Sequence, residues 1–194
     1  MDRYMSFNIH INEMCKKIIG TLMFINRIKD NFDKSTRIMV IEALVLSQIN
    51  YCNIIWGSAS KTQLQRVQRL QNFAAKVADG SARKFDLATP IINRLKWMKI
   101  KQKCEHDLCC FIFKMLNGGL PEWFISLPTV AQVTQGGTRQ ANNLFIPRMR
   151  TEIGTKAIKV RGPTIWNNLP SHIREFGNFS GFKNALKQYS LGRL

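Results

Sequence analysis

The sequence predicts a mainly α-helical protein, in which a helical bundle precedes a smaller, irregular C-terminal region with short strands and helices. Three observations lead to this fold class. Apolar residues recur at intervals of three and four in the first two thirds of the chain, and capping residues and glycines bracket those stretches. After Pro128 this pattern gives way to a segment rich in Gln, Thr and Gly. We therefore expect two domains, residues 1–128 and residues 129–194.

The first two helices are expected to begin at polar capping residues. Asn8 is placed to cap a helix, and either Asp33 or Ser35 can cap the next one, which runs toward Trp56 and ends before Gly57. The apolar stripe of the first helix consists of Ile11, Met14, Cys15, Ile18, Leu22 and Ile25. The stripe of the second consists of Ile38, Ile41, Val45 and Ile49. Each stripe predicts one buried helix face.

Three further helices complete the predicted bundle. Ser58 or Ser60 opens the third helix, and Asp79-Gly80 is a plausible C-terminal stop. Thr89-Pro90 suits a cap followed by a first-turn proline. A further helix is expected from about residue 100 to 116, ending at residues 117–119 (Asn-Gly-Gly), and Pro121 is expected to start one short turn.

The C-terminal region is expected to be less regular. Residues 130–137 are interpreted as a soft linker and residues 144–146 as a short extended run. Residues 157–161 alternate apolar and basic side chains with the period of a strand. Residues 163–168 and 180–191 are expected to form short helices. Trp56 and Trp166 each follow apolar residues, which favours packing in a core over stacking on a nucleobase.

Composition places the chain among folded, reduced, non-membrane proteins. Its 194 residues are 45% hydrophobic and include 12 Phe and 4 Trp, enough for a core without disulfides. The 5 cysteines are odd in number and irregularly spaced, and no secretory leader is recognisable, so we expect free thiols in the nucleus or cytoplasm. The longest uncharged run, residues 43–60, contains Ser, Gln and Asn, which argues against a membrane span.

The charge balance predicts an anionic partner. Lys and Arg number 29 against 12 Asp and Glu, which gives a formal net charge of +17. Residues 61–84 hold 6 cations against 1 acid, and residues 129–194 hold 10 against 2, so two blocks supply most of the excess. Such an excess repels itself unless an anion compensates it, and nucleic acid is the first candidate.

The third helix is the first candidate site. At about 100° per residue, Val67, Leu70, Ala74, Val77 and Ala78 share one side. The other side carries the candidate nucleic-acid-binding residues Lys61, Gln65, Arg69, Asn72 and Lys76, with Arg66 beside them. No carboxylate lies between Gly57 and Asp79 to pair with these cations. A plain solvated face is the alternative, but we favour contact with a sugar–phosphate backbone.

The second basic block is the other candidate site for nucleic-acid binding. Its pattern is equally compatible with contact to a sugar–phosphate backbone and with a surface that is merely exposed to solvent. This second block, residues 139–161 within the C-terminal excess, carries Glu152 as its one acid. Its candidate residues are Arg148, Arg150, Lys156, Lys159 and Arg161.

The sequence offers no evident catalytic, cofactor or metal site. Its acids are dispersed, and Glu105 and Asp107 point about 200° apart on a helix. Cys104 and Cys109 diverge by about 140°, so with His106 and Cys110 they are interpreted as buried residues and not zinc ligands. Gly118-Gly119 lacks the Lys-Ser/Thr of a phosphate loop.

Short motifs spread along the chain carry a resemblance to one family. They are residues 50–52 (Asn-Tyr-Cys) with Trp56-Gly57, 69–72 (Arg-Leu-Gln-Asn) with 74–76 (Ala-Ala-Lys), 114–118 (Lys-Met-Leu-Asn-Gly), Thr138-Arg139, 142–144 (Asn-Asn-Leu) leading to Pro147-Arg148 and Arg150-Thr151, 161–163 (Arg-Gly-Pro) with 165–167 (Ile-Trp-Asn) and Leu169-Pro170, Ile173-Arg174, and Phe179 with Phe182-Lys183 and Leu186-Lys187. In this order and spacing the chain resembles the C-terminal portion, the thumb and the segment after it, of a reverse transcriptase from non-LTR (LINE-type, jockey-like) retrotransposons.

The resemblance implies a thumb-like bundle that holds a template–primer duplex, with Gln65, Arg69, Asn72 and Lys76 along the backbone track. Phe73 departs from the family, in which Arg is commoner at that step. The paired aspartates of the catalytic palm, preceded by an aromatic residue, do not occur in this sequence. We therefore expect a non-catalytic fragment that grips RNA, DNA or a hybrid without sequence specificity.

Two alternatives remain. In the first, the chain is a relic with no independent binding function that needs a palm domain in order to fold, and Phe7, Ile9 and Ile11 are the apolar surface that would meet the palm. In the second, the chain is part of an active enzyme whose palm lies upstream.

Overall fold

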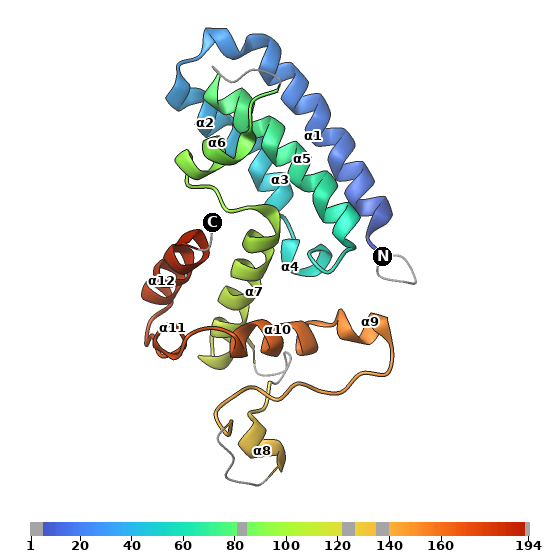
Figure 1. Ribbon diagram of the computed structural model, residues 1–194, viewed down its shortest axis with the longest axis vertical. Coiled ribbons are helices and arrows are strands. Elements are labelled where there is room, and N and C mark those ends of the chain that lie inside the picture. Colours follow the sequence, from blue (N-terminus) through green and yellow to red (C-terminus); the bar gives the residue numbers. More distant parts are fainter. Residues whose placement is uncertain (1–5, 81–84, 122–126, 135–139, 193–194) are drawn as a thin grey trace. The chain divides into compact units, whose positions relative to one another are not determined.

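The computed structural model describes residues 6–80, 85–121, 127–134 and 140–192, and these are mainly helical (Figure 1), as predicted. The chain divides into two compact units, residues 1–104 and 105–193. Helix α7 (Ile100–Leu116) contributes residues to both units. The division between the compact units thus lies inside a helix. The sequence predicts a domain boundary near residue 128, and this boundary stays a prediction.

The first unit opens with α1 (Asn8–Ile28), whose predicted stripe is confirmed because all six of its residues are buried. The predicted cap is wrong. Phe7, with a positive φ of 57°, occupies the N-cap position, and Asn8 is the first helical residue. The Phe7 side chain is buried in the core, so apolar anchoring and not a polar cap fixes the start of the helix.

The second predicted helix forms in several segments. After the 3₁₀ turn η1 (Lys29–Asn31), α2 (Lys34–Ile41) continues through the π-helical turn η2 (Glu42–Leu46) into α3 (Ser47–Asn50), and α4 (Asn53–Trp56) follows. Asp33 caps α2, since its carboxylate accepts hydrogen bonds from the backbone N–H groups of Ser35 and Thr36. Trp56 is buried, as predicted, and its indole N–H donates to the Tyr51 carbonyl at 2.9 Å.

Helix α5 (Lys61–Asp79) contacts α1, α2 and α6 (Ala88–Arg94). Both of its predicted ends are confirmed: Ser60 accepts a hydrogen bond from the Gln63 N–H, and Gly80 follows with φ of 76°, a conformation that favours glycine. The start of α6 is corrected, because Leu87 is its N-cap residue and Thr89 and Pro90 lie within the first turn.

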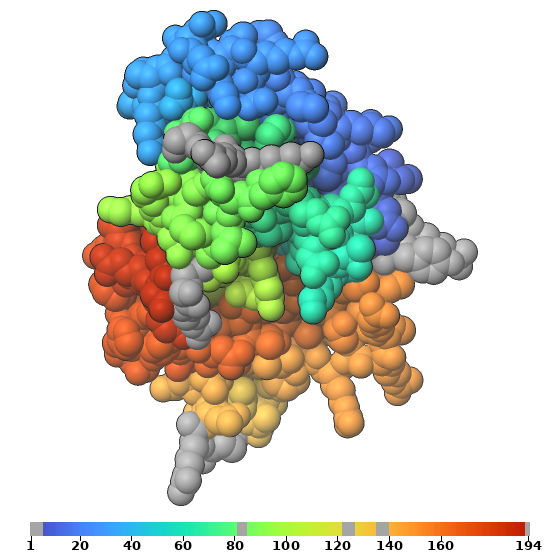
Figure 2. Space-filling model, turned by 45° about the horizontal axis from the view of Figure 1, so that its top comes forward, coloured from blue at the N-terminus to red at the C-terminus, as the bar shows by residue number. Residues whose placement is uncertain are grey.

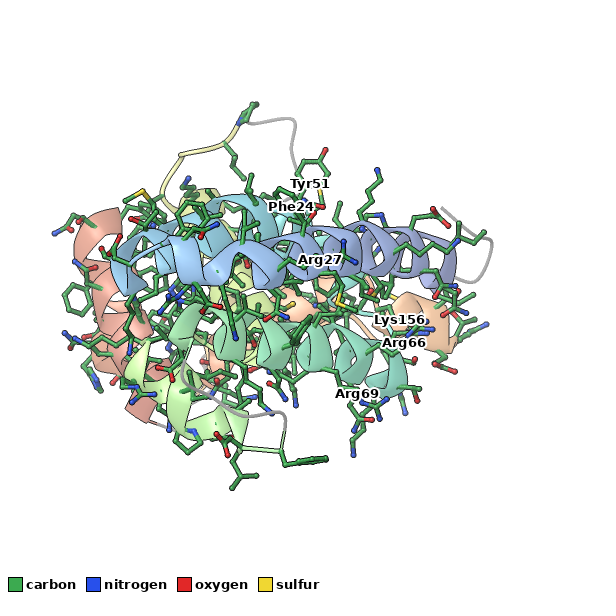
Figure 3. All side chains as sticks on the ribbon, turned by 90° about the horizontal axis from the view of Figure 1, so that it is seen from above. Phe24, Arg27, Tyr51, Arg66, Arg69 and Lys156 are labelled. Carbon is green, nitrogen blue, oxygen red and sulfur yellow. The ribbon has the colours of Figure 1, made fainter. Side chains whose placement is uncertain are left out.

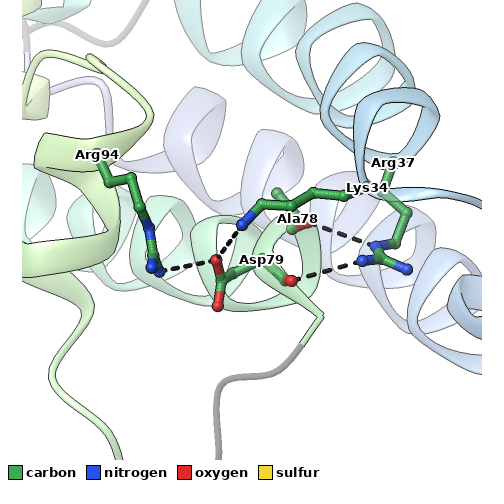
Figure 4. Close-up of polar contacts among 5 residues, drawn as sticks. All are labelled: Lys34, Arg37, Ala78, Asp79 and Arg94. Carbon is green, nitrogen blue, oxygen red and sulfur yellow. Dashed lines mark hydrogen bonds and ion pairs between the residues drawn. The ribbon is translucent and has the colours of Figure 1, made fainter.

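A cluster of cations holds the C-terminal end of α5 (Figure 4). The buried Asp79 carboxylate binds the Lys34 ammonium at 3.0 Å and the Arg94 guanidinium at 2.8 Å. Arg37 donates to the carbonyls of Ala78 and Asp79, each at 3.4 Å. The last carbonyls of a helix need such donors, so these contacts satisfy the helix end and tie α2, α5 and α6 together.

In its described residues, the second unit contains the later part of α7 and five more helices. They are α8 (Val130–Thr134), α9 (Glu152–Thr155), α10 (Ile158–Asn167), α11 (Ser171–Arg174) and α12 (Phe179–Gly192). Phe182 stacks on Phe113 with ring centroids 4.4 Å apart and contacts Trp166 at 5.6 Å. A Cβ on Gly162 would lie 2.6 Å from the Ile112 side chain, so glycine permits the close approach of α10 to α7. Trp166 is a core residue, as predicted.

The predicted strands of the C-terminal region are wrong. Residues 158–161 begin α10, with Ala157 as N-cap residue, because two apolar and two basic residues in alternation are too few to distinguish a strand from a helix. Of residues 144–146, only Leu144 pairs, in an isolated antiparallel bridge with Thr129. The predicted linker contains α8, while residues 135–139 and the turn expected after Pro121, at 122–126, lie outside the described residues.

Three further expectations concern the apolar surface, the thiols and membrane-spanning segments. Of the three residues expected to face a palm domain, Ile9 is 72% exposed, but Phe7 and Ile11 are buried in the unit's own core. All five cysteines are free thiols, and four of them are buried, with Cys52 as the exposed exception. No helix in the described parts of the chain is both long enough and apolar enough to cross a membrane.

Candidate nucleic-acid interface

Helix α5 has one buried side and one exposed side, as its sequence predicts. The predicted apolar residues Val67, Leu70, Ala74, Val77 and Ala78 are all buried. Lys61, Gln65 and Arg69 are exposed, and at about 100° per residue they lie within an arc of about 80°. We call these three residues the α5 face. The start of α5 reaches the molecular surface next to α4 (Figure 2).

The electrostatics of the α5 face favour an anion. Neither Lys61 nor Arg69 forms an ion pair within the described residues, and the first turn of α5 contains no acid. Lys61 lies in that first turn, where the helix dipole is positive and a cation is unfavourable by roughly 0.3–1 kcal/mol. Phosphate groups placed along this face would reduce the repulsion between the cations and would interact favourably with the positive end of the helix dipole.

Three acids of the first unit, Asp33, Glu42 and Asp79, are engaged elsewhere. Asp79, the one acid of α5, is buried and bound by Lys34 and Arg94. Asp33 caps α2, and Glu42 accepts a hydrogen bond from the Trp97 indole at 2.8 Å. These carboxylates therefore stabilise the fold, and their geometry leaves the α5 face positive.

Asn72 and Lys76, predicted as part of the same face, are only half-exposed. Gln68 donates to the side-chain oxygens of Gln71 and Asn72, each at 2.9 Å. Gln71 is buried and donates to the Met98 carbonyl at 2.8 Å, and the backbone N–H of Ile100 donates to Gln68 at 2.9 Å. Lys76 is half-buried and takes part in an interaction within the chain. The later turns of α5 are therefore used for packing against residues 98–100 as well as facing solvent.

Arg66 lies on the side of α5 toward α1, roughly 60° around the helix from Arg69 (Figure 3). Its guanidinium donates to the side-chain oxygens of Asn12 and, at 3.5 Å, of Gln63. Gln63 in turn donates to the Asn8 side chain at 2.8 Å. Because Asn8 and Asn12 meet Gln63 and Arg66 in the same chain direction, α1 and α5 run parallel here. The sequence analysis did not identify Asn8 and Asn12 as residues that contact α5. The available signal was their spacing, since residues four apart lie on the same side of a helix.

The second basic block does not form one face. In α10, Lys159 and Arg161 point roughly 160° apart, so the helix separates cations that a strand would align. Lys156 binds Glu152 at 3.2 Å, and Arg161 is half-buried with an interaction inside the chain. Arg148 and Arg150 are exposed in an irregular segment. The structure therefore separates Lys159 from Arg161 and engages Lys156 and Arg161 within the chain, unlike the cations of the α5 face.

The cysteine and histidine residues of α7 are buried, as the sequence predicts. His106 lies 3.1 Å from the Asp107 carboxylate and 3.9 Å from the Cys110 sulfur. Burial, with smaller effects of Cys110 and Glu105, raises the pKa of Cys109 to about 12, so its reactive thiolate form is suppressed near neutral pH. Among the described residues, no three His, Cys, Asp or Glu side chains are grouped so that they could hold a metal ion.

Comparison with known proteins adds no relative: no protein-family model matches the chain, and neither a curated protein nor a solved structure is significantly similar to it. Any function is therefore inferred from the chain's own residues, and the best-formed candidate site is the α5 face with its flanking residues Arg66, Asn72 and Lys76.

Proposed function

We propose that the first unit binds the sugar–phosphate backbone of RNA, DNA or an RNA–DNA hybrid along the α5 face, without sequence specificity and without catalysis. The observation that carries this proposal is the exposure of Lys61 and Arg69 on an acid-free face, while Asp79 is buried and already neutralised. Lys and Arg neutralise phosphates, and the Gln65 amide can bond to sugar or phosphate oxygens irrespective of base sequence.

The wider proposal is that the chain is a non-catalytic fragment of a retrotransposon RNA-directed DNA polymerase. It rests on the ordered motifs that resemble the thumb of that family, including residues 69–72 and 74–76 on α5. In that role the α5 face would follow one strand of the template–primer duplex. The alternatives remain a relic that needs a palm domain to fold and a segment of an active enzyme with its palm upstream.

Charge reversal on α5 tests the binding proposal. We expect Lys61→Glu combined with Arg69→Glu to weaken binding of a blunt RNA–DNA hybrid by more than about 10-fold at low salt, because two attractive contacts become repulsive. Fluorescence anisotropy with labelled hybrid, DNA duplex and duplexes of unrelated sequence measures this. Both side chains are exposed, so circular dichroism should report unchanged helicity.

The matched control reverses two other exposed cations of the same unit, Lys17→Glu with Arg27→Glu on α1, which changes net charge equally. If the control weakens binding as much as the α5 variant does, net charge and not the α5 face attracts the nucleic acid. If the parent protein binds no nucleic acid at all, the relic hypothesis is favoured over the binding proposal.

A further inference from the structure

A groove of about 540 Å³ lies between α1 and the first turns of α5. Arg66 lines it from α5, and the rest of the lining comes from α1: Ile9, Asn12, Cys15, Lys16 and Ile19, together with Glu13. Its volume falls in the range of small-molecule sites, roughly 300–1,000 Å³. Arg66 is only one turn from Arg69, so the groove adjoins the α5 face.

The polar groups of the groove suit an anion that also carries hydrogen-bonding groups. Arg66 uses only its Nη1 atom for its bonds to Asn12 and Gln63, which leaves Nε and Nη2 available to a phosphate. The bond to Asn12 also engages only the side-chain oxygen of that residue, so its amide N–H groups can donate to a ligand. Glu13 pairs with Lys16 at 3.0 Å, and both are exposed, so Arg66 leaves the groove with a positive charge.

Two apolar side chains of the groove, those of Ile9 and Ile19, are exposed in the described part of the first unit. Ile9 is 72% and Ile19 is 45% exposed, and at 1.5 Å per residue they are separated by roughly 15 Å along α1. Between them lies Cys15, which is buried. Burial raises the pKa of the Cys15 thiol, an effect that Arg66 partly opposes, so near neutral pH an uncharged thiol is expected there.

This combination fits an unpaired nucleotide better than it fits a paired one or an acidic peptide. The bases of a duplex are stacked and cannot reach isoleucine side chains, whereas an unpaired base exposes an apolar ring and polar edges. An acidic peptide would use the charge of Arg66 but would not require Ile9 or Ile19. A single strand would use the guanidinium, the amide and the apolar contacts together.

We propose that the α1–α5 groove receives unpaired nucleotides at the single-stranded end of the nucleic acid that α5 holds, with the bases of successive nucleotides against Ile9 and Ile19 and a phosphate on Arg66. This inference rests on the proposed function. The backbone contact of the α5 face does not by itself distinguish a paired end from a single-stranded one. The groove would make that distinction, because it would bind only unpaired nucleotides. Single-stranded DNA and RNA share the required chemistry, and separate overhangs of each distinguish them.

The experiment compares a blunt duplex with duplexes that carry a short DNA or RNA overhang, using anisotropy of the full chain at one salt concentration. We expect at least one overhang to raise affinity about fivefold, below the effect of aromatic stacking on several bases. Ile9→Ala with Ile19→Ala should remove this gain and leave blunt-duplex affinity unchanged. Met23→Ala with Leu44→Ala, which also truncates two exposed apolar residues but lies outside the groove, should retain the gain.

The outcomes separate the two proposals. Absence of any overhang gain, or a gain that survives in the Ile9/Ile19 variant, overturns the groove assignment while leaving backbone binding intact. If blunt duplex does not bind, a free single strand is titrated instead, and binding that does not depend on Ile9 and Ile19 also overturns the assignment. A polyglutamate peptide that competes as well as the single strand would show that the groove recognises charge alone.

Discussion

The α5 face and the second basic block both come from segments rich in Lys and Arg and poor in acids, but their structures differ. On α5 the cations recur at helical spacing, the core residues occupy the opposite side, and Lys61 and Arg69 remain exposed together. In residues 148–161 the cations alternate or fall in irregular backbone, and folding turns them to different sides or pairs them, as in Lys156 with Glu152. An excess of charge alone therefore does not predict a binding surface. The spacing of the charged residues must also match the periodicity of the helix or strand that carries them.

The two regions also use their acids differently, and the largest effect we expect comes from that contrast. Asp79 is buried between Lys34 and Arg94, whereas Glu152 is 85% exposed in its pair with Lys156. Asp79→Asn should lower the free energy of unfolding by about 1–3 kcal/mol, less than for a fully buried pair because both cations are about half-exposed and can be resolvated. Urea unfolding followed by circular dichroism measures the loss.

The matched variant, Glu152→Gln, should change the free energy of unfolding by less than about 0.5 kcal/mol, since an i,i+4 pair whose carboxylate is 85% exposed contributes little. Equal losses in the two variants would mean that the Asp79 cluster does not hold the end of α5. A large loss for Glu152→Gln alone would reverse the comparison between the regions.

Salt dependence sharpens the comparison of the two basic regions. Lys61→Gln with Arg69→Gln should reduce the slope of log K against log salt concentration by about 2, because each lost phosphate contact removes close to one released counterion. Arg148→Gln with Lys159→Gln removes the same charge from the second block and should change the slope by clearly less than one. Titration of a DNA duplex at several salt concentrations gives both slopes. Equal changes would mean that the two blocks contribute alike.

Periodic features of this chain were predictable from sequence, and features that need distant partners were not. The six buried residues of α1, the Asp33 cap and both ends of α5 follow from spacing and local hydrogen bonding. Gln71 carries a polar side chain, yet it is buried because the Met98 carbonyl, 27 residues away, accepts its hydrogen bond. The start of α10 was missed because four alternating residues carry too little periodic information.

The candidate site divides in the same way. The α5 face depends on the phase of one helix, so its exposed residues could be inferred from their spacing. The groove depends on α1 lying parallel to α5, which brings Asn12 to Arg66 over 54 residues of sequence. Helix pairing of this kind leaves no short-range signal, so the sequence predicts Ile9 only as part of a surface for a palm domain and does not identify Ile19, whereas the structure shows both exposed in one groove with Arg66.

The smallest expected effect concerns the cap of α2, which contrasts with the apolar start of α1 at Phe7. The Thr36 hydroxyl, with backbone N–H groups of Thr36 and Ser35, holds the pKa of the Asp33 carboxyl below its ordinary value. A depressed folded-state pKa means that the cap stabilises the folded protein above the ordinary pKa of aspartate, and that this contribution is lost as pH falls through the lower, folded-state value. The carboxyl carbon shift of Asp33, followed by NMR in acid, should therefore give a midpoint below that of a model peptide.

The control is Asp33→Asn, because asparagine also caps helices but does not titrate. In this variant the amide shifts of Ser35 and Thr36 should lose the acid transition that the parent shows, while the start of α2 stays in place. The start of α1 offers the internal reference: with Phe7 buried at its N-cap position, and no carboxylate in its first turn, amides there should show no transition that tracks Asp33. A shared transition at both helix starts would indicate global acid unfolding, and the local account of the α2 cap would then be wrong.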